Sequence, residues 1–316
     1  MKKKKYEFLC TVHMGEESVN VFSTSSEILP LFTRGDFIFF LPEWKVDFNK
    51  TSSRLKLFFR ESPRVSIRLS RNSLHVEGGI RELRIGHTLP YLVHYILERE
   101  RMKKNQMTLH AAAVSRNGRG IMILGKQGSG KTSIALELCR NYNCLLVGND
   151  LVFAGLYKRK GYLFGGTKFF RVRETTVKYY NQDIRKFLKK KSDEWTNIAI
   201  ITPGDIGVRV EKSPVPILGV FYVHLYPPWY PFCVKKVDLR FSRVYLHQIC
   251  SEYIRGSAII PLVGKDLKYG DYLPSLDSKI FFKKRTGFID WVIQNKNYKY
   301  IAGSLSDICH FIDKHL

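Results

Sequence analysis

Residues 121–132 read Ile-Met-Ile-Leu-Gly-Lys-Gln-Gly-Ser-Gly-Lys-Thr, and this stretch decides how the surrounding chain folds. Its first four residues, Ile121–Leu124, form a continuous apolar run, which is typical of a buried strand in a parallel sheet. A helix is expected directly afterwards, because apolar residues then recur at helical spacing, at Ile134, Ala135, Leu138 and Cys139. The sequence therefore predicts a buried strand, a glycine-rich loop and a helix, in that order.

The loop follows the pattern Gly-x-x-x-x-Gly-Lys-Thr from Gly125 to Thr132. Glycines let backbone N–H groups converge on phosphate oxygens, and the N-terminus of the following helix directs positive charge at the same place. The pattern therefore predicts a nucleotide-phosphate site, in which Lys131 reaches the β- and γ-phosphates and the Thr132 hydroxyl holds Mg²⁺. The predicted nucleotide contacts are Gly125, Gly128, Ser129, Gly130, Lys131, Thr132 and Ser133. A glycine loop with a surface lysine is the alternative, which the strand-loop-helix context disfavours.

The chain has 316 residues, enough for one large hydrophobic core or two smaller ones. We expect two domains, a β-rich one over residues 1–104 and an α/β one over residues 105–316. In the first, strands are predicted at Phe37–Leu41, Leu55–Phe59 and Val65–Leu69. A helix is predicted over Leu89–Met102, with Thr88 as its N-cap and with one apolar face made by Leu89, Leu92, Val93, Ile96 and Leu97.

The second domain is predicted to be organised around the loop. A strand at Leu109–Ser115, a tight turn at Asn117–Gly118 and a returning strand at Gly120–Leu124 precede it. The elements expected after the loop helix are a strand at Cys144–Val147, a hairpin of Leu151–Tyr157 with Gly161–Phe164, a helix over Glu174–Lys191, a strand at Ile217–Leu225, and helices over Val244–Ile254 and Phe288–Asn295.

Gly148-Asn149-Asp150 follows the predicted strand at Cys144–Val147. In proteins with such a phosphate loop, an acidic residue at the end of a neighbouring strand holds Mg²⁺, directly or through water. We therefore take Asp150, Asn149 and Thr132 as the candidate metal ligands. Asp150 as a plain turn residue is the alternative reading.

The chain has 52 basic and 28 acidic side chains, so its net charge is 52 − 28 = +24. Such a charge attracts polyanions over a long range at low salt, which keeps nucleotides, nucleic acids and acidic membranes open as partners. Much of the excess lies in runs at Lys2–Lys5, Lys189–Lys191 and Lys283–Arg285, for which solvated faces are the simpler interpretation.

Targeting and cysteine usage point to an intracellular protein. The segment Tyr6–Val19 lacks the apolar core of an export signal. The most apolar windows, near Phe37–Leu41 and Val215–Phe232, are too short or too interrupted by proline to span a bilayer. The six cysteines show neither a C-x-x-C pair nor metal-ligand spacing, as expected of reduced thiols. We therefore expect a soluble, cytoplasmic protein without a membrane span.

Three motifs occur in an informative order: His110-Ala-Ala-Ala113, the loop Gly125–Thr132, and Asn149-Asp150. This order resembles the HPr serine kinase/phosphorylase superfamily, whose pattern is His-Gly/Ala-x-Ala, then the phosphate loop, then an acidic pair. The match covers roughly residues 109–175. The resemblance implies an α/β fold with an HPr-kinase-like core, and phosphorylation of a serine hydroxyl from ATP with Mg²⁺. Arg171-Val-Arg173 looks like the basic segment that follows the hairpin in relatives outside the HPr-specific branch.

Two departures from that family affect the expected substrate. Asn149 stands where the family often has a first aspartate, so Asp150 must carry more of the catalytic work. The family's Glu-x-Arg-Gly segment should follow the acidic pair closely, whereas Glu252–Gly256 lies about a hundred residues further on and is taken as an accidental match. The resemblance therefore favours a relative such as the kinases that modify the terminal serine of lasso peptides over a true HPr kinase.

The sequence thus favours an ATP-dependent kinase that phosphorylates an alcohol on a peptide or small molecule. Asp150, helped by His110, is expected to orient and deprotonate the acceptor, while Lys131 and Arg171 or Arg173 steady the phosphates. A nucleic-acid-associated ATPase is a weaker alternative, because no RNA-binding motif accompanies the charge. An inactive nucleotide-binding module is the third. His110 as an ordinary strand histidine and the two arginines as solvated charges stay open, as does the oligomeric state.

Overall fold

The computed structural model describes residues 5–85, 88–180, 182–188, 197–256, 262–263, 268–269 and 273–316. The fold is a mixed α/β one, and it divides into two compact units. The first unit comprises Met1–Lys104 and Ser251–Lys283, and the second comprises Asn105–Cys250 and Lys284–Leu316. Within the described ranges, we find no helix with the length and apolar character needed to cross a bilayer.

The first unit is built on a six-stranded sheet in the order β3-β1-β2-β4-β6-β5. Its strands are β1 (Glu7–Met14), β2 (Glu17–Ser23), β3 (Trp44–Asp47), β4 (Lys56–Glu61), β5 (Ser66–Leu69) and β6 (Ser73–Gly78). The described helices and short strands around it are η1 (Ser26–Ile28), α1 (Pro30–Thr33), η2 (Asp36–Phe39), α2 (Ile80–Ile85), α3 (Thr88–Lys103), β17 (Leu262–Val263) and β18 (Lys268–Tyr269).

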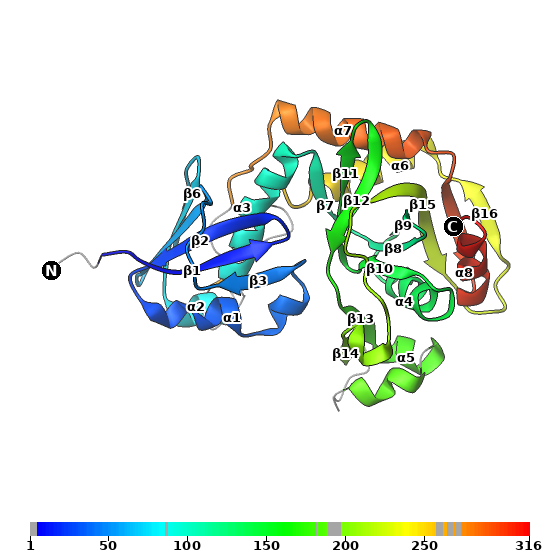
Figure 1. Ribbon diagram of the computed structural model, residues 1–316, viewed down its shortest axis with the longest axis horizontal. Helices are drawn as coiled ribbons and strands as arrows, with labels where there is room; N and C mark the ends of the chain where they lie inside the picture. The colour runs from blue at the N-terminus through cyan, green and yellow to red at the C-terminus, as the bar shows by residue number, and fades with distance from the viewer. Residues whose placement is uncertain are drawn as a thin grey trace. The chain divides into compact units, whose positions relative to one another are not determined.

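Helix α3 packs against this sheet through the apolar face that the sequence predicts (Figure 1). The five side chains of that face are fully buried in the core of the unit: Leu89, Leu92, Val93, Ile96 and Leu97. Thr88 is itself the first helical residue, so the helix begins one residue earlier than predicted.

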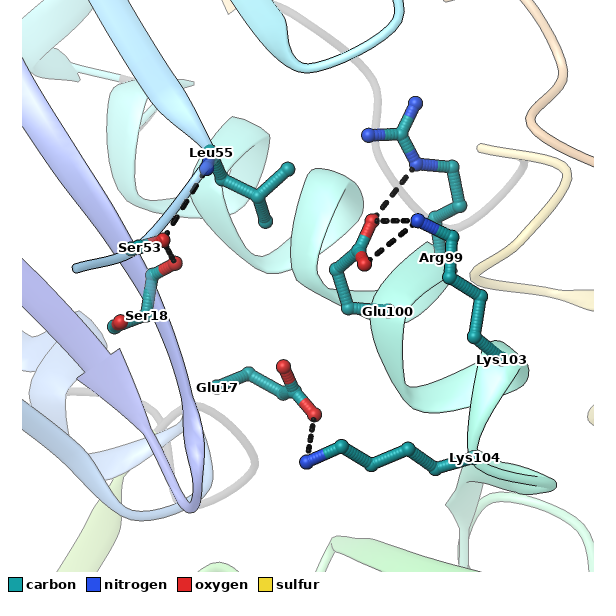
Figure 2. Close-up of polar contacts among 8 residues, drawn as sticks. All are labelled: Glu17, Ser18, Ser53, Leu55, Arg99, Glu100, Lys103 and Lys104. Atoms are coloured by element: carbon teal, nitrogen blue, oxygen red, sulfur yellow. Dashed lines mark hydrogen bonds and ion pairs between the residues drawn. The ribbon is translucent and has the colours of Figure 1, made fainter.

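Polar side chains surround the C-terminal end of α3 (Figure 2). Lys104 donates to Glu17 of β2 at 2.8 Å, and the Glu100 carboxylate binds Lys103 at 2.7 Å. The hydrogen bond with Glu17 is the main reason why the pKa of Lys104 is raised. Because the lysines are half exposed, each pair contributes little to stability, about 0–1 kcal/mol. The apolar face of α3 therefore holds this unit together.

The second unit contains a nine-stranded sheet, in which seven strands follow the order β10-β8-β9-β15-β12-β11-β7 and β19 joins β15 to β16. The strands are β7 (Gln106–His110), β8 (Ala112–Arg116), β9 (Arg119–Leu124), β10 (Leu145–Gly148), β11 (Leu151–Tyr157), β12 (Lys160–Gly166), β15 (Val215–Leu225), β16 (Cys233–Lys236) and β19 (Tyr298–Gly303). Strand β9 runs parallel to β15, and β15 runs parallel to β19.

Helices and a small second sheet complete this unit. They are α4 (Lys131–Asn141), α5 (Glu174–Tyr180), η3 (Gln182–Phe187), η4 (Gly204–Ile206), α6 (Leu239–Ser251), α7 (Lys279–Gln294), α8 (Leu305–Asp313), and the pair β13 (Phe170–Arg173) and β14 (Ile198–Ile201). Of α6 and α7, the residues up to Cys250 and from Lys284 onward belong to this unit. Helices α4 and α8 pack side by side, α4 against β8 and β9 and α8 against β19, and their apolar side chains form one core cluster with those strands and β15 (Figure 1).

Two strand connections pass from one part of the large sheet to another at the same place. Strand β7, which pairs with β11, is linked through Ala111 to β8, which pairs with β10. Strand β10 is in turn linked to β11 through the dipeptide Asn149-Asp150. The Ala111 N–H donates to the Asp150 carbonyl at 3.2 Å, which joins the two links. Gly148 is needed beside them, because a Cβ there would lie 2.8 Å from Gly166 Cα of β12. This corner of the sheet holds His110 and Asp150.

Three predicted elements are wrong. Leu109–Ser115 is not one strand but two, because the chain changes partners at Ala111. The predicted strand at Phe37–Leu41 is replaced by a 3₁₀ helix over Asp36–Phe39. A short apolar run without polar–apolar alternation is equally compatible with a turn that packs on a hydrophobic core.

The third error is the helix over Glu174–Lys191. It ends at Tyr180, and a 3₁₀ helix follows, which buries Ile184 while Asp183 pairs with Arg140 of α4 at 2.6 Å. Residues 189–191, including that lysine run, lie outside the described residues, as do Lys2–Lys4.

The remaining predicted elements of the second unit are present, although two helices have shifted ends. Helix α6 begins five residues before the predicted Val244, at Leu239, and α7 begins nine residues before Phe288, at Lys279. The turn at Asn117–Gly118 is confirmed, with φ of 52° and 72° at its two central residues. Both values lie in the left-handed region, as required by a two-residue hairpin loop of type I′.

Candidate functional site

The glycine-rich loop lies between β9 and α4, as the sequence predicts. Gly130 is the N-cap of α4 with φ of 92°, and a Cβ at this position would lie 2.5 Å from Leu225 Cβ on β15. Only glycine can adopt this left-handed backbone conformation and also leave room for Leu225. The Ile134 N–H donates to Gly130 O, so the N–H groups of Lys131–Ser133 precede the first helical bond and lack intrahelical acceptors.

The Lys131 ammonium folds into the loop. Its Nζ donates to the carbonyl oxygens of Gly125 at 2.9 Å and Lys126 at 3.1 Å. Burial lowers the pKa of Lys131 to about 8, while the negative charge of Asp150 acts in the opposite direction. Lys131 therefore lies within electrostatic reach of Asp150, although the two residues come from different strand ends.

Two tyrosines from outside the sequence motif hold the start of the loop. The Gly125 N–H donates to Tyr245 Oη of α6 at 3.1 Å, and the backbone of Lys126 lies near the Tyr222 hydroxyl of β15. Burial raises the pKa of both tyrosines, so both hydroxyls are neutral and fixed by their neighbours. Nothing in the sequence singles out these tyrosines, because neither residue lies near the loop in the chain.

The other predicted loop residues divide into exposed and buried positions. Gly128 has φ of 81° and open space beside it, so a ligand can approach its backbone. Ser129 is buried, and its hydroxyl faces Gly125 from inside the loop. Thr132 is half-buried on the first turn of α4, whereas Ser133 is buried in that turn. The backbone around Gly128, together with Thr132, thus forms the accessible part, whereas Lys131 and Ser129 are buried.

Asp150 lies at the sheet corner between β10 and β11, with φ of 75°. Its Oδ1 is 3.3 Å from His110 Nε2, and its Oδ2 is 3.6 Å from an Arg171 guanidinium nitrogen. Burial acts to raise the pKa of Asp150, but the hydrogen bond and charge of His110, with the charges of Arg171 and Lys131, outweigh it and lower the pKa. Asp150 is therefore an ionised carboxylate at neutral pH.

The two arginines lie on β13, where Phe170 and Val172 are buried and Arg171 and Arg173 alternate with them. The arginines thus share the face of β13 that the sequence predicts. Arg171 reaches Asp150, and Arg173 extends the same row of positive charge.

Asn149 is fully buried, unlike Asp150. Its Nδ2 donates to the Phe169 carbonyl at 3.1 Å, and its backbone N–H donates to the Thr167 carbonyl at 2.9 Å. Both acceptors belong to the segment that links β12 to β13. The Asn149 amide therefore positions the strand that carries Arg171.

The donors that could hold a magnesium ion are few. In the ranges that the structure describes, no group of three or more His, Cys, Asp or Glu side chains is arranged to hold a metal ion. Mg²⁺ in phosphoryl-transfer sites typically uses one or two carboxylates, with phosphates and water as its other ligands. Asp150 and the Thr132 hydroxyl fit that chemistry, and the buried Asn149 side chain fits it less well.

Comparisons with known proteins find similarity to solved structures. No protein-family model matches the chain, and no curated protein matches it. A solved structure, the Hpr(Ser) kinase/phosphatase from Coxiella burnetii, is similar over 66% of this chain and 93% of that chain, with 12% sequence identity and a TM-score of 0.32. At that score, the assignment of a function depends on the geometry of the chain itself.

Replacing Asn149 by aspartate should destabilise the second unit, although it would restore an acidic pair. The new carboxylate would face the Phe169 carbonyl without a proton to donate, a loss of about 1–3 kcal/mol. Urea unfolding at about pH 7 measures the loss, with Asn117→Asp in an exposed turn as the matched control. Equal unfolding free energies for Asn149→Asp and wild type would show that the amide contact is unimportant.

Removing the His110 ring should raise the pKa of Asp150, because the hydrogen bond and charge that oppose the effect of burial would disappear. Carbon-13 NMR of the labelled aspartate carboxyls, titrated without Mg²⁺, measures the midpoint in His110→Ala and wild type. His310→Ala, on the exposed side of α8, should leave it unchanged. An unshifted midpoint in His110→Ala would contradict the contact.

Proposed function

We propose that the chain is an ATP-dependent kinase that transfers the γ-phosphoryl group to a serine-type hydroxyl of a peptide or small molecule. One observation carries the proposal: the sheet corner places Asp150, His110 and Arg171 in contact, and Asp150 is electrostatically coupled to the loop lysine, Lys131. A phosphate-binding loop, a carboxylate and cations are the parts that phosphoryl transfer requires.

The loop residues have binding and charge-neutralising roles in this proposal. Backbone N–H groups from Gly128 to Thr132 would bind the phosphates, and Lys131 would place its charge between the β- and γ-phosphates. Mg²⁺, held by Thr132 and Asp150, would neutralise charge on the phosphate oxygens. The carbonyls that now bind Lys131 keep its ammonium inside the loop, ready for an anionic ligand.

Asp150 is the candidate base of the reaction. Its carboxylate would accept the proton of the acceptor hydroxyl, whose oxygen then forms the new bond to the γ-phosphorus as the bond to the ADP oxygen breaks. A low pKa suits this role, because the transition state of phosphoryl transfer is loose and mainly needs the hydroxyl oriented. His110 and Arg171 would orient the carboxylate through the contacts described above.

The acceptor is proposed to be a small hydroxyl compound or peptide, including the C-terminal serine of a lasso peptide precursor. Arg171 and Arg173 lie on one face of β13 and could bind a carboxylate beside the reacting alcohol. Two arginines 2 residues apart on one strand suit a terminal carboxylate better than an internal serine of a folded protein.

Phosphate transfer from radiolabelled MgATP to serine-ended peptides and small alcohols, with and without DNA or RNA, tests the proposal. Lys131→Ala should abolish transfer, because the variant loses the charge nearest the bridging oxygens, and the rate should fall on the order of a thousandfold. If DNA or RNA stimulates the phosphate transfer, or if a folded Lys131→Ala variant transfers phosphate at nearly the wild-type rate, the kinase proposal is contradicted. ATP binding without any transfer would favour an inactive module.

Asp150→Asn should reduce turnover more than nucleotide affinity. An amide can hydrogen-bond water around Mg²⁺ but cannot accept a proton, so kcat should fall at least about a hundredfold while the ATP dissociation constant changes less. Isothermal titration and single-turnover kinetics separate the two effects. Unchanged turnover in this variant would mean that the base lies elsewhere.

A further inference from the structure

A cavity of about 390 Å³ adjoins the glycine-rich loop, within the second unit. Its lining includes Lys126 of the loop, Tyr222 of β15, Lys235 and Lys236 of β16, Phe241 of α6 and Tyr300 of β19. The volume lies in the range of small-molecule sites. The proposed kinase mechanism uses none of these side chains.

Aromatic rings form part of the cavity wall. Phe241 meets Tyr222 edge to face, with ring centroids 5.3 Å apart, and Tyr300 stacks beside Tyr222 at 6.1 Å. Phe241 is 39% exposed, so part of its ring is open to a ligand. Such walls bind flat apolar rings, and stacking one nucleobase on an aromatic side chain contributes about 1–3 kcal/mol.

The charges of the cavity favour an anion. Lys126, Lys235 and Lys236 line it, against the single carboxylate of Asp238. That carboxylate is already engaged, because its Oδ1 accepts the Phe241 N–H at 2.7 Å. A ligand that joins a flat ring to negative charges matches both the aromatic and the charged parts of this wall.

The cavity is physically connected to the loop. Lys126 is the second loop residue, and it lines the cavity together with Tyr222, whose hydroxyl lies near the Lys126 backbone. Tyr245, which accepts the Gly125 N–H, stacks on Phe241 with nearly parallel rings 5.7 Å apart. A molecule bound against Phe241 and Tyr222 therefore lies beside the start of the loop.

The loop itself indicates the direction in which a bound nucleotide would extend. Asp150 is electrostatically coupled to Lys131, near the end of the loop, whereas Lys126, near its start, lines the cavity. Phosphates held by the loop would thus have the carboxylate toward one end of the loop and the aromatic cavity toward the other. An extended nucleoside triphosphate has its γ-phosphate and its base at opposite ends.

We propose that this cavity binds the base and ribose of the nucleoside triphosphate whose phosphates occupy the loop, with Phe241 stacking on the base. The inference rests on the proposed nucleotide site. Under this proposal, Phe241, Tyr222 and Lys126 increase the affinity for a nucleoside triphosphate. They do not increase the affinity for inorganic polyphosphate, because it has no base.

The test compares ATP with inorganic tripolyphosphate, both with Mg²⁺, by isothermal titration. Phe241→Ala should weaken ATP binding about tenfold and change tripolyphosphate binding less than about twofold, because only ATP carries a base. Val244→Ala, an exposed residue one turn further along α6, is the matched control and should change neither. Lys131→Ala should weaken both ligands, since it acts on the phosphates.

The outcomes separate the two proposals. If the wild-type protein binds neither ligand, or if Lys131→Ala weakens the binding of neither, the proposed nucleotide site is wrong. The proposed base subsite is then wrong as well. If Lys131→Ala weakens both but Phe241→Ala weakens neither, or both equally, the phosphate site stands and the base subsite is wrong.

A second measurement on the unaltered chain does not depend on the folding of any variant. Photolabelling with 8-azido-ATP, mapped by peptide mass spectrometry, should mark residues 222–241 or Tyr300. Excess tripolyphosphate should prevent the labelling by occupying the loop. Label confined to other parts of the second unit would overturn the assignment of the base.

Discussion

The hydrogen bond from the Ala111 N–H to the Asp150 carbonyl is the constraint on which the candidate site depends. At this point two neighbouring strands leave one part of the large sheet and enter another, and the bond keeps the two crossings together. Asp150 lies at this crossing with a positive φ of 75°, a conformation that is uncommon for residues other than glycine. His110 and Asp150 are brought together by backbone geometry, and their side chains then interact.

The loop depends on a second set of contacts from a different region. The strand and helix that flank it are local in sequence, but its first residue is held by Tyr245, and Tyr222 lies near its second residue. Both tyrosines lie about a hundred residues further along the chain. These tyrosines pack edge to face, with ring centroids 5.0 Å apart. A change in the position of α6 would therefore be transmitted directly to Gly125 through Tyr245.

The sequence predicts the local parts of this molecule better than its crossings. Strand β9, the loop, α4 and the hairpin of β11 and β12 follow from apolar runs, glycines and turn residues, which act over a few positions. The break at Ala111 was missed because alanine suits a strand interior and a corner equally. The tyrosine contacts and the burial of Asn149 depend on segments distant in the chain, so no local pattern contains them.

Charge balance gives a physical reason for a single carboxylate at the corner. Lys131 and Arg171 lie near Asp150, and burial lowers the pKa of Lys131. The negative charge of a bound polyphosphate would oppose that effect of burial on Lys131. A second carboxylate in place of Asn149 would lie in a fully buried position, where the amide instead donates to Phe169. Burying an unpaired carboxylate is costly, whereas the amide aligns the strand that carries Arg171. The architecture of the corner thus favours asparagine before the aspartate.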